Sequence, residues 1–291
     1  MENKKRRGDR WDGTRIRGLD GVHAMMPFLF PNRCDSEVYL YETIDVTDLM
    51  EELERVKGEN PDAKVTPFHY FIAALAKTLY HRPYLNRFIA GRRYYQRKKL
   101  TFAFMVKRFF HDEAQEMIMV LDVSGDMTIK DLQQKIAGDV EEMRDHGKTD
   151  VDGLLDFLCK MPRFVMRFIM TVFRFLDFHG WMPKSICNSD TNYASVLVSN
   201  LGSIKCDACY HHLNNYGTNS IMITIGNVHR IPVVDTAGTI TPRWVVNFGI
   251  TLDERIADGF YFARSVKLLK YLIANPKLLE APIKEAVDYD E

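Results

Sequence analysis

The stretch "TLDERIADGFYFARSV", Thr251 to Val266, decides the fold because it joins a strand to a helix through a run of charged residues. The run before it, "RWVVNFGITLD", has the β-branched and aromatic residues of a strand. The residues after it predict a helix from about Gly259 to Ala274, which ends before Pro276. Whether this junction can take part in a reaction depends on the role of Glu254.

Two segments in the first third of the chain carry strong local signals. "SEVYLYETIDV", residues 36–46, predicts a strand, and Thr47 begins the helix that follows it. In "TPFHYFIAALAKTLYHRPYLN", Thr66 is a helix cap and Pro67 occupies the first helical position. The apolar residues after Pro67 recur at helical spacing, which predicts a buried helix.

The remaining elements do not alternate regularly. Strands are expected at 100–109 and 117–123, and Thr128 and Asp131 have capping-box spacing before a helix. A helical segment rich in Met and Phe follows at about 154–180, and further strands are expected in "ASVLVSNLG" and "SIMITIGNV". This mixture favours an α+β fold over a doubly wound parallel sheet.

Composition excludes several classes of protein. The chain has 291 residues, 46% hydrophobic and 27% charged, which is typical of a globular protein with a substantial core. Lys plus Arg and Asp plus Glu number 39 each, so no overall charge favours nucleic acid. Five cysteines and no signal sequence indicate reduced thiols and a cytoplasmic location. We expect a basic N-terminal tail at 1–20 and one domain at 21–291.

Four motifs in order establish a resemblance. They are "TIDVTDL", the Pro-initiated helix, "VSNLGS" and "ITLDERIADGFYFA". Together they resemble the chloramphenicol acetyltransferase superfamily, and most closely the catalytic domain of the dihydrolipoyl acyltransferases of 2-oxoacid dehydrogenase complexes. The resemblance covers most of residues 22–280 and implies a two-layer mixed sheet packed with helices. The hydrophobic helical segment at about 150–188 is an insertion.

The resemblance assigns roles to several residues. Ser199 in "SNLG" matches the serine that stabilises the oxyanion, and Asp258 matches an aspartate that holds the site together by pairing with an arginine. Arg33 is the candidate arginine. The closing family motif is Asp-His-Arg-x-x-Asp-Gly, whose histidine is the general base. Here the other positions match (Asp253, Arg255, Asp258 and Gly259), and Glu254 replaces the histidine.

The glutamate leaves two interpretations of the site open. A carboxylate with an ordinary pKa of about 4.3 is a poor base for a thiol of pKa about 8.5. Burial in an apolar channel would raise the pKa of Glu254 toward about 6 to 7, as in other catalytic glutamates. Otherwise the site is degenerate, and Glu254 pairs with Arg255 or with a neighbouring chain.

The segment "CDACYHHLNNYG" contains the other candidates. His211 and His212 are candidates for a substitute base, or they cap the end of a strand or helix. Cys206 and Cys209 crowd with the histidines into seven residues, which is too compact for a closed tetrahedral zinc site, so we expect no metal.

Two further segments have alternative interpretations. "GRRYYQRKK", residues 91–99, is expected to be a solvated strand face or to contribute to binding coenzyme A phosphates. In the inserted segment, apolar residues nearly encircle the helix except at Arg163, Arg167 and Arg174. Packing on its own domain or a neighbouring subunit, a lid over an acyl-chain channel, and docking on a membrane surface are the alternatives. At 15 residues its longest apolar run, Phe164 to Phe178, is too short to span a bilayer.

The sequence therefore predicts a coenzyme A-dependent acyltransferase that moves an acyl group from acyl-coenzyme A to a small-molecule thiol, hydroxyl or amine. The resemblance implies a homotrimer with its sites between subunits. The chain contains no lipoyl domain with its modified lysine, so a free-standing catalytic domain is expected. The alternative is a non-catalytic trimeric scaffold or ligand-binding protein on the same fold.

Overall fold

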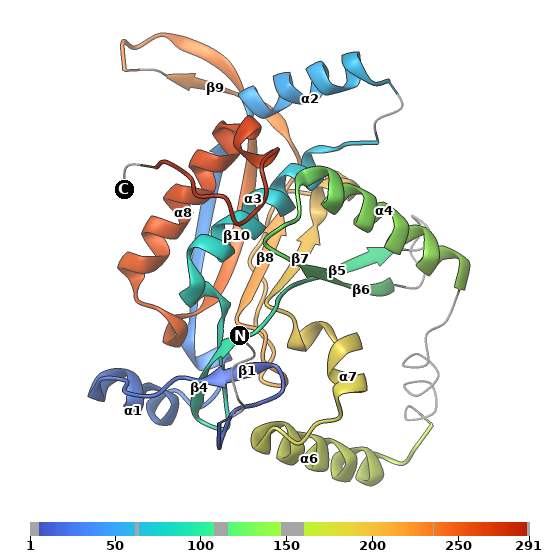
Figure 1. The fold of residues 1–291 in the computed structure, drawn as a ribbon, viewed down its shortest axis with the longest axis vertical. Helices are drawn as coiled ribbons and strands as arrows, with labels where there is room; N and C mark the ends of the chain where they lie inside the picture. The colour runs from blue at the N-terminus through green and yellow to red at the C-terminus, as the bar shows by residue number, and fades with distance from the viewer. Residues whose placement is uncertain (1–5, 62–63, 108–115, 147–159, 235, 290–291) are drawn as a thin grey trace.

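The computed structural model describes residues 6–61, 64–107, 116–146, 160–234 and 236–289. The fold is α+β, as the sequence predicted, with helices packed on a mixed sheet (Figure 1). The α-helices are α1 (Gly21–Leu29), α2 (Thr47–Glu59), α3 (Pro67–His81), α4 (Ile129–His146), α6 (Arg163–His179), α7 (Lys184–Ser189) and α8 (Gly259–Ala274). The 3-10 turns are η1 (Cys34–Ser36), η2 (Pro83–Asn86), η3 (Thr191–Tyr193), η4 (Leu201–Ile204), η5 (Glu254–Ile256) and η6 (Pro276–Leu279).

The main sheet has the strand order β2–β10–β8–β7–β5–β6, with β9 also paired to β10. β7 runs parallel to β5 and β8, whereas the other pairs are antiparallel. The strands of the main sheet are β2 (Glu37–Asp45), β5 (Leu100–Lys107), β6 (Glu116–Val123), β7 (Val196–Asn200), β8 (Ile221–Ile225), β9 (His229–Val234) and β10 (Ile240–Asp253). A small sheet has the order β1 (Gly13–Arg15), β4 (Arg93–Arg97) and β3 (Arg87–Ala90).

The core lies between the main sheet and the helices on one of its faces. Figure 1 shows α8, α3 and α4 crossing this face of the sheet. α3 is buried from His69 to Leu79, and its Phe71 ring meets Phe248 of β10 edge-on at 5.5 Å between centroids. Burying large apolar side chains of this kind contributes about 2 kcal/mol each, so this layer supplies much of the folding free energy.

Local capping interactions begin the helices where the sequence predicts them. Thr66 and His69 form a reciprocal capping box at the start of α3, with Pro67 at the first position. At α4 the backbone amide of Thr128 donates to the Asp131 carboxylate at 2.8 Å. Asp258 caps α8 by accepting the amide of Tyr261 at 2.7 Å. Each cap satisfies backbone donors that the first helical turn leaves free.

The N-terminal segment differs from the expected tail. β1 pairs with β4, with Gly13 opposite Arg97, and the buried side chains of Arg10 and Asp12 form an ion pair at 2.8 Å. The charged composition predicted solvation, but these charges neutralise each other inside the fold. From about Asp9 onward the segment is part of the folded body.

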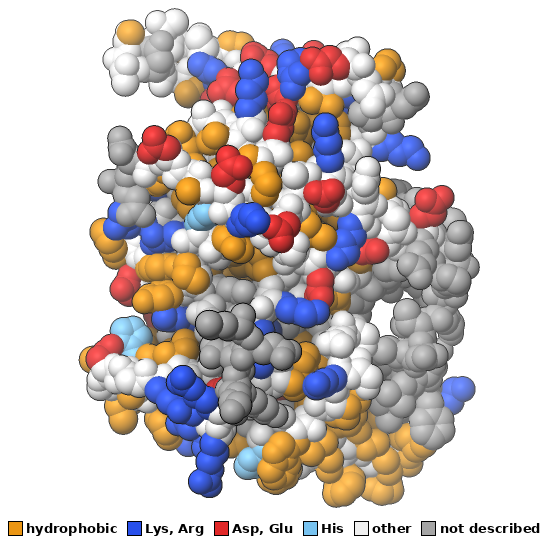
Figure 2. All heavy atoms as spheres, viewed as in Figure 1, with side chains coloured by type: hydrophobic (Ala, Val, Ile, Leu, Met, Phe, Trp, Pro, Cys, Tyr) orange, Lys and Arg blue, Asp and Glu red, His pale blue; other side chains and the backbone are white. Residues whose placement is uncertain are grey.

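The inserted segment contributes α6 and α7, while the residues of the expected helix at 154–159 lie outside the described part of the chain. α6 leaves apolar side chains in solvent, including Phe164, Phe168 and Phe175, which are 75%, 70% and 55% exposed. α6 lies at the lower end of the molecule in Figure 1, where Figure 2 shows hydrophobic side chains gathered on the surface. Packing on its own domain therefore does not cover this side of α6. No helix among the described residues is long and apolar enough to cross a membrane.

Candidate functional site

Ser199 lies on the face of the main sheet opposite the helical core. Val196 and Val198 of β7 are buried against the helices, and side chains alternate along a strand, so the half-buried Ser199 faces the other way. In the register of the sheet Ser199 pairs with Thr224 of β8, and Thr224 pairs with Gly249 of β10. These three residues form a row across the sheet.

The segment after Ser199 covers this second face. The hydroxyl of Thr224 donates to the carbonyl of Cys209 and accepts the Cys209 amide at 3.1 Å. The amide group of Asn247 donates to the Asp207 carboxylate at 3.1 and 3.0 Å. A Cβ at Gly249 would lie 2.2 Å from the Cys209 carbonyl oxygen, so only glycine lets the segment approach so closely.

Replacing Gly249 by alanine is therefore expected to lower the free energy of unfolding by about 1–3 kcal/mol, as for an overpacked core. The control is Gly138→Ala in α4, where an added Cβ meets nothing within 4 Å. That change is expected to stabilise the protein by about 0.5–1 kcal/mol. Urea unfolding of both variants checks the difference, and a stable Gly249→Ala protein would contradict the packing argument.

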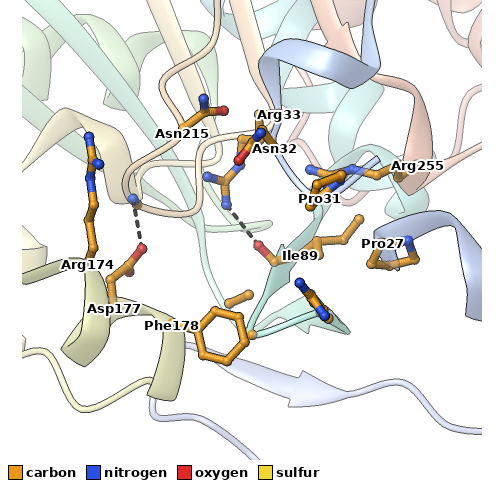
Figure 3. A pocket seen from close by; sticks show the side chains of 14 residues that line it. Pro27, Pro31, Asn32, Arg33, Ile89, Arg174, Asp177, Phe178, Asn215 and Arg255 are labelled. Atoms are coloured by element: carbon orange, nitrogen blue, oxygen red, sulfur yellow. Dashed lines mark hydrogen bonds between the residues drawn. The ribbon is translucent and has the colours of Figure 1, made fainter. Parts of the chain in front are cut away.

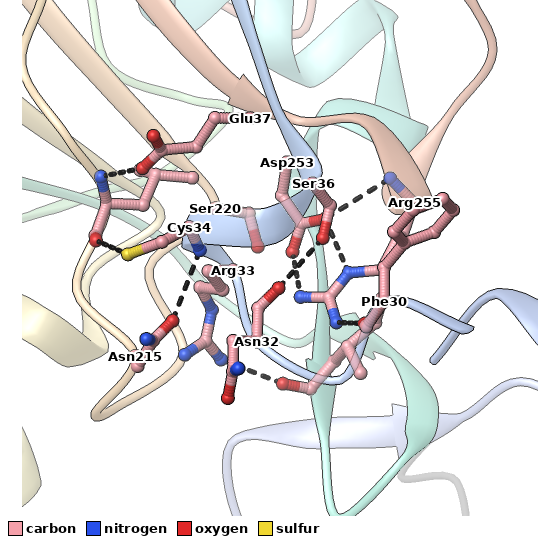
Figure 4. Close-up of polar contacts among 12 residues, drawn as sticks. Phe30, Asn32, Arg33, Cys34, Ser36, Glu37, Asn215, Ser220, Asp253 and Arg255 are labelled. Carbon is pink, nitrogen blue, oxygen red and sulfur yellow. Dashed lines mark hydrogen bonds and ion pairs between the residues drawn. The ribbon is translucent and has the colours of Figure 1, made fainter. Parts of the chain in front are cut away.

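Glu254 follows Asp253, the last residue of β10, and begins η5. Figure 4 shows the side chains of its two neighbours, Asp253 and Arg255, pointing toward each other. The side chain of Glu254 is half-buried, and its two neighbours are buried completely. Arg255 donates from Nε and Nη2 to the two oxygens of Asp253, each at 2.7 Å, and from Nη1 to the Phe30 carbonyl at 2.7 Å. The pairing of Glu254 with Arg255, one alternative for a degenerate site, is not formed among the described residues, because Arg255 is held by Asp253.

The expected ion pair between Arg33 and Asp258 is also not formed among the described residues. The buried Arg33 donates instead to the carbonyls of Ile89 at 2.8 Å and Asn214 at 3.3 Å. Asp258 is exposed and caps α8. The helix cap holds the Asp258 carboxylate at the surface, whereas Arg33 points into the interior.

Ser199 and Glu254 lie at different positions along the strand direction of the sheet. Gly249 is in the row of Ser199, and Glu254 is five residues further along the same chain. At about 3.4 Å per residue this separation is about 17 Å along the strand direction. The two side chains therefore do not meet within one chain.

His211 and His212 lie on a segment that runs from the row of Ser199 to the end of β10 near Glu254. Cys209 contacts Thr224 in the row of Ser199, and the amide of Leu213 donates to Glu37, which is opposite Asp253 in the sheet register. Both histidines are exposed, and their rings stack at 4.7 Å between centroids. Neither imidazole ring is therefore buried within this chain.

The described cysteines are free thiols. Cys206 and Cys209 are exposed, and Cys187 is buried, where desolvation raises the pKa of its thiol to about 12. Within the described ranges, no group of three or more His, Cys, Asp or Glu side chains is arranged to hold a metal ion.

Comparison with solved structures identifies the fold. The chain has the fold of the chloramphenicol acetyltransferase-like acyltransferases, as expected from its sequence. A structure named chloramphenicol acetyltransferase aligns with 90% of this chain and 99% of its own length, with a TM-score of 0.54 and 10% identity. The cubic core of a pyruvate dehydrogenase multienzyme complex aligns with 91% of this chain and 93% of its own, with a TM-score of 0.61 and 17% identity.

Two sequence comparisons find similarity to acyltransferase catalytic domains. Residues 183–281 match the profile of the family described as 2-oxoacid dehydrogenases acyltransferase (catalytic domain). The lipoamide acyltransferase component of the branched-chain alpha-keto acid dehydrogenase complex of Bacillus subtilis (strain 168) is 23% identical over 235 residues. That alignment covers 80% of this chain and 45% of the relative, so the chain spans less than half of the relative's length. The predicted resemblance to these catalytic domains is confirmed.

One feature near the motif was not predicted as a site. Arg33, Arg92, Arg174 and Arg255 line one pocket although they come from four separate segments. Arg92 lies in the basic run that begins at Gly91, and Arg255 lies in the closing motif, but no pattern in the sequence indicates that the four arginines meet.

Proposed function

We propose that this protein is an acyltransferase that moves an acyl group from acyl-coenzyme A to a small-molecule thiol, hydroxyl or amine. The main support is the coincidence of the fold with a retained Ser199 and a motif whose Asp253 and Arg255 hold Glu254 at the end of β10. A cytoplasmic location remains part of this proposal.

The reaction uses two groups of the chain. Glu254 takes a proton from the thiol, hydroxyl or amine of the acceptor molecule while the sulfur, oxygen or nitrogen atom of that group attacks the thioester carbonyl. The hydroxyl of Ser199 donates a hydrogen bond to the oxygen that becomes negative in the tetrahedral intermediate. When the intermediate collapses, the C–S bond breaks, and the coenzyme A thiolate takes the proton from Glu254. Asp258 contributes by capping the first turn of α8, the helix that directly follows the motif.

The separation of Ser199 and Glu254 supports an assembly in which two chains share a site. We propose a homotrimer in which Glu254 of one chain meets Ser199 of the next. A structural neighbour is the cubic core of a multienzyme complex, and cubic symmetry contains threefold axes. The exposed His211 and His212 would then lie at the subunit boundary as candidates for a substitute base.

Glu254 itself favours the second candidate function, a non-catalytic trimeric scaffold or ligand-binding protein. The position that carries the general-base histidine in the resembled family holds a weaker base here. Coenzyme A affinity separates the two functions, because a scaffold that has lost its site has no need of it. Calorimetric titration with coenzyme A and acyl-coenzyme A esters is the first test, and saturable binding supports the acyltransferase.

Replacing Glu254 by glutamine is expected to lower acyl transfer by at least about 10²-fold without loss of coenzyme A binding, because only the proton acceptor is removed. Glu254→His is expected to raise turnover at neutral pH, since imidazole has a pKa of about 6.5. Glu54→Gln, an exposed change on α2, is the control. If the Glu254→Gln and unmodified proteins turned over equally fast, Glu254 would not be the base, and His211 or His212 would be the candidate.

A further inference from the structure

A pocket of about 340 Å³ lies between the end of α1, the turn joining β3 and β4, the C-terminal half of α6 and the loop that precedes Gly217. Figure 3 shows Arg33, Arg174 and Arg255 around it, with Asp177 at one side. One wall of the pocket is α6, which lies in the segment that the resemblance marks as an insertion. The volume is within the range of roughly 300–1,000 Å³ typical of small-molecule sites.

The charges of the pocket are unequal. Four guanidinium groups line it, against the carboxylate of Asp177 and that of Asp253 behind Arg255. Both carboxylates are already engaged. The oxygens of Asp177 accept the Tyr193 hydroxyl at 2.8 Å and the Gly217 amide at 3.1 Å, and those of Asp253 accept Arg255. Two positive charges are left in excess.

Arg33 lies in the wall of this pocket and is only 5% exposed. Its hydrogen-bond partners are backbone carbonyls, and its Nε is buried with no partner among the described residues. Burial lowers the pKa of Arg33, although the charges of Asp253 and Asp177 oppose this effect. A buried cation that lacks an ion pair is costly, and a bound anion would offset that cost.

The other two arginines can complete a binding site. Arg92 and Arg174 are exposed, and neither takes part in an ion pair within the described part of the chain. Gly91 and Arg92 have left-handed backbones, with φ of 55° and 59°, and a Cβ at Gly91 would lie 2.4 Å from the Phe178 carbonyl oxygen. The turn is thus packed directly against α6, so the pocket is built before any ligand arrives.

We propose that this pocket binds a small molecule through a phosphomonoester group. A phosphomonoester near neutral pH carries almost two negative charges, which matches the excess of the lining. Its oxygens accept hydrogen bonds from several guanidinium groups at once, and arginine suits this geometry better than lysine does. The apolar side chains of Pro27, Ile89 and Phe178 leave room for an organic group beside the phosphate. The proposal does not depend on acyl transfer.

The test is calorimetric titration of the full chain with inorganic phosphate at constant ionic strength. Arg174→Gln and Arg92→Gln are each expected to weaken binding by about tenfold, the usual effect of one charge-assisted hydrogen bond. Arg163→Gln is the matched control, because it removes the same charge from the same helix but lies 11 residues, or about 16 Å, from Arg174. The first two variants change exposed residues, so both should fold.

Loss of phosphate affinity in the two pocket variants but not in Arg163→Gln supports the proposal. Absence of phosphate binding, or equal binding by all variants, overturns it. Coenzyme A and 3′-dephospho-coenzyme A then identify the source of the phosphate. If Arg174→Gln weakens the binding of coenzyme A but not that of 3′-dephospho-coenzyme A, the pocket takes the 3′-phosphate of coenzyme A. If phosphate binding is lost but coenzyme A binding is unchanged, the pocket takes another phosphomonoester, and the acyltransferase proposal is unaffected.

Discussion

Replacing Asp253 by asparagine is expected to lower the free energy of unfolding by about 3–5 kcal/mol, because it leaves the Arg255 guanidinium buried without its counter-ion. The side chains of Asp253 and Arg255 are 0% and 2% exposed, and two hydrogen bonds of 2.7 Å join them. Arg255 also holds the Phe30 carbonyl, so the end of α1 would loosen with it. Denaturant unfolding at one fixed protein concentration measures the change, since assembly makes stability depend on concentration.

Two variants make this result specific. Asp126→Asn removes an aspartate whose partner, Lys284, is 55% exposed, and an exposed ion pair of this kind contributes little. Asp253→Asn combined with Arg255→Gln removes both buried charges and is expected to recover part of the lost stability. If Asp253→Asn were no more damaging than Asp126→Asn, the buried pair would not be what holds the motif.

The elements that sequence predicted well are those with complete local signals. The predicted helix at Gly259–Ala274 has the same bounds as α8, because its cap at Asp258 and its end before Pro276 are both local. The strand expected within residues 91–99 is β4, but its partners in the small sheet were not predicted, and its Tyr94, Tyr95 and Arg97 are buried and not solvated. β1 pairs with a strand about 80 residues away, and Arg10 and Asp12 beside it form a buried ion pair, whereas the charged composition of the segment predicts solvation. Pairing at that distance is not indicated by the residues of either segment alone.

The same distinction applies to the site. Ser199 and the closing motif could be located from sequence because each is a short contiguous run. The partners of Arg33 could not, since the contact with Asn214 joins residues 181 positions apart. The arginine pocket combines four segments that are far apart in the sequence. Arg255 lies in the closing motif and Arg92 in the basic run at 91–99, but nothing in either run indicates that the segments meet. Electrostatic excess in a cavity is a property of the folded chain and not of any one motif.

Replacing Ser199 by alanine is expected to lower the turnover of acyl-coenzyme A by about 10²–10³-fold, with little change in coenzyme A affinity. A hydrogen bond to a developing oxyanion is strong in the transition state and weak in the ground state, so its loss affects turnover and not binding. Ser199 is half-buried on the side of β7 away from the helical core, so the truncation should leave the fold intact. Steady-state kinetics and calorimetry on the same preparation separate the two effects.

Ser203→Ala is the matched control, because Ser203 lies four residues away, is exposed, and donates its hydroxyl to the Asn200 carbonyl at 2.7 Å. Ser199→Thr retains a hydroxyl and is expected to recover part of the activity. A loss of coenzyme A affinity in Ser199→Ala at unchanged turnover would assign Ser199 to ground-state binding. Since Ser199 and Glu254 are about 17 Å apart along one chain, mixing Ser199→Ala with Glu254→Gln protomers gives a second readout. Partial recovery of activity in the mixed assembly would show that each site takes its two groups from different chains.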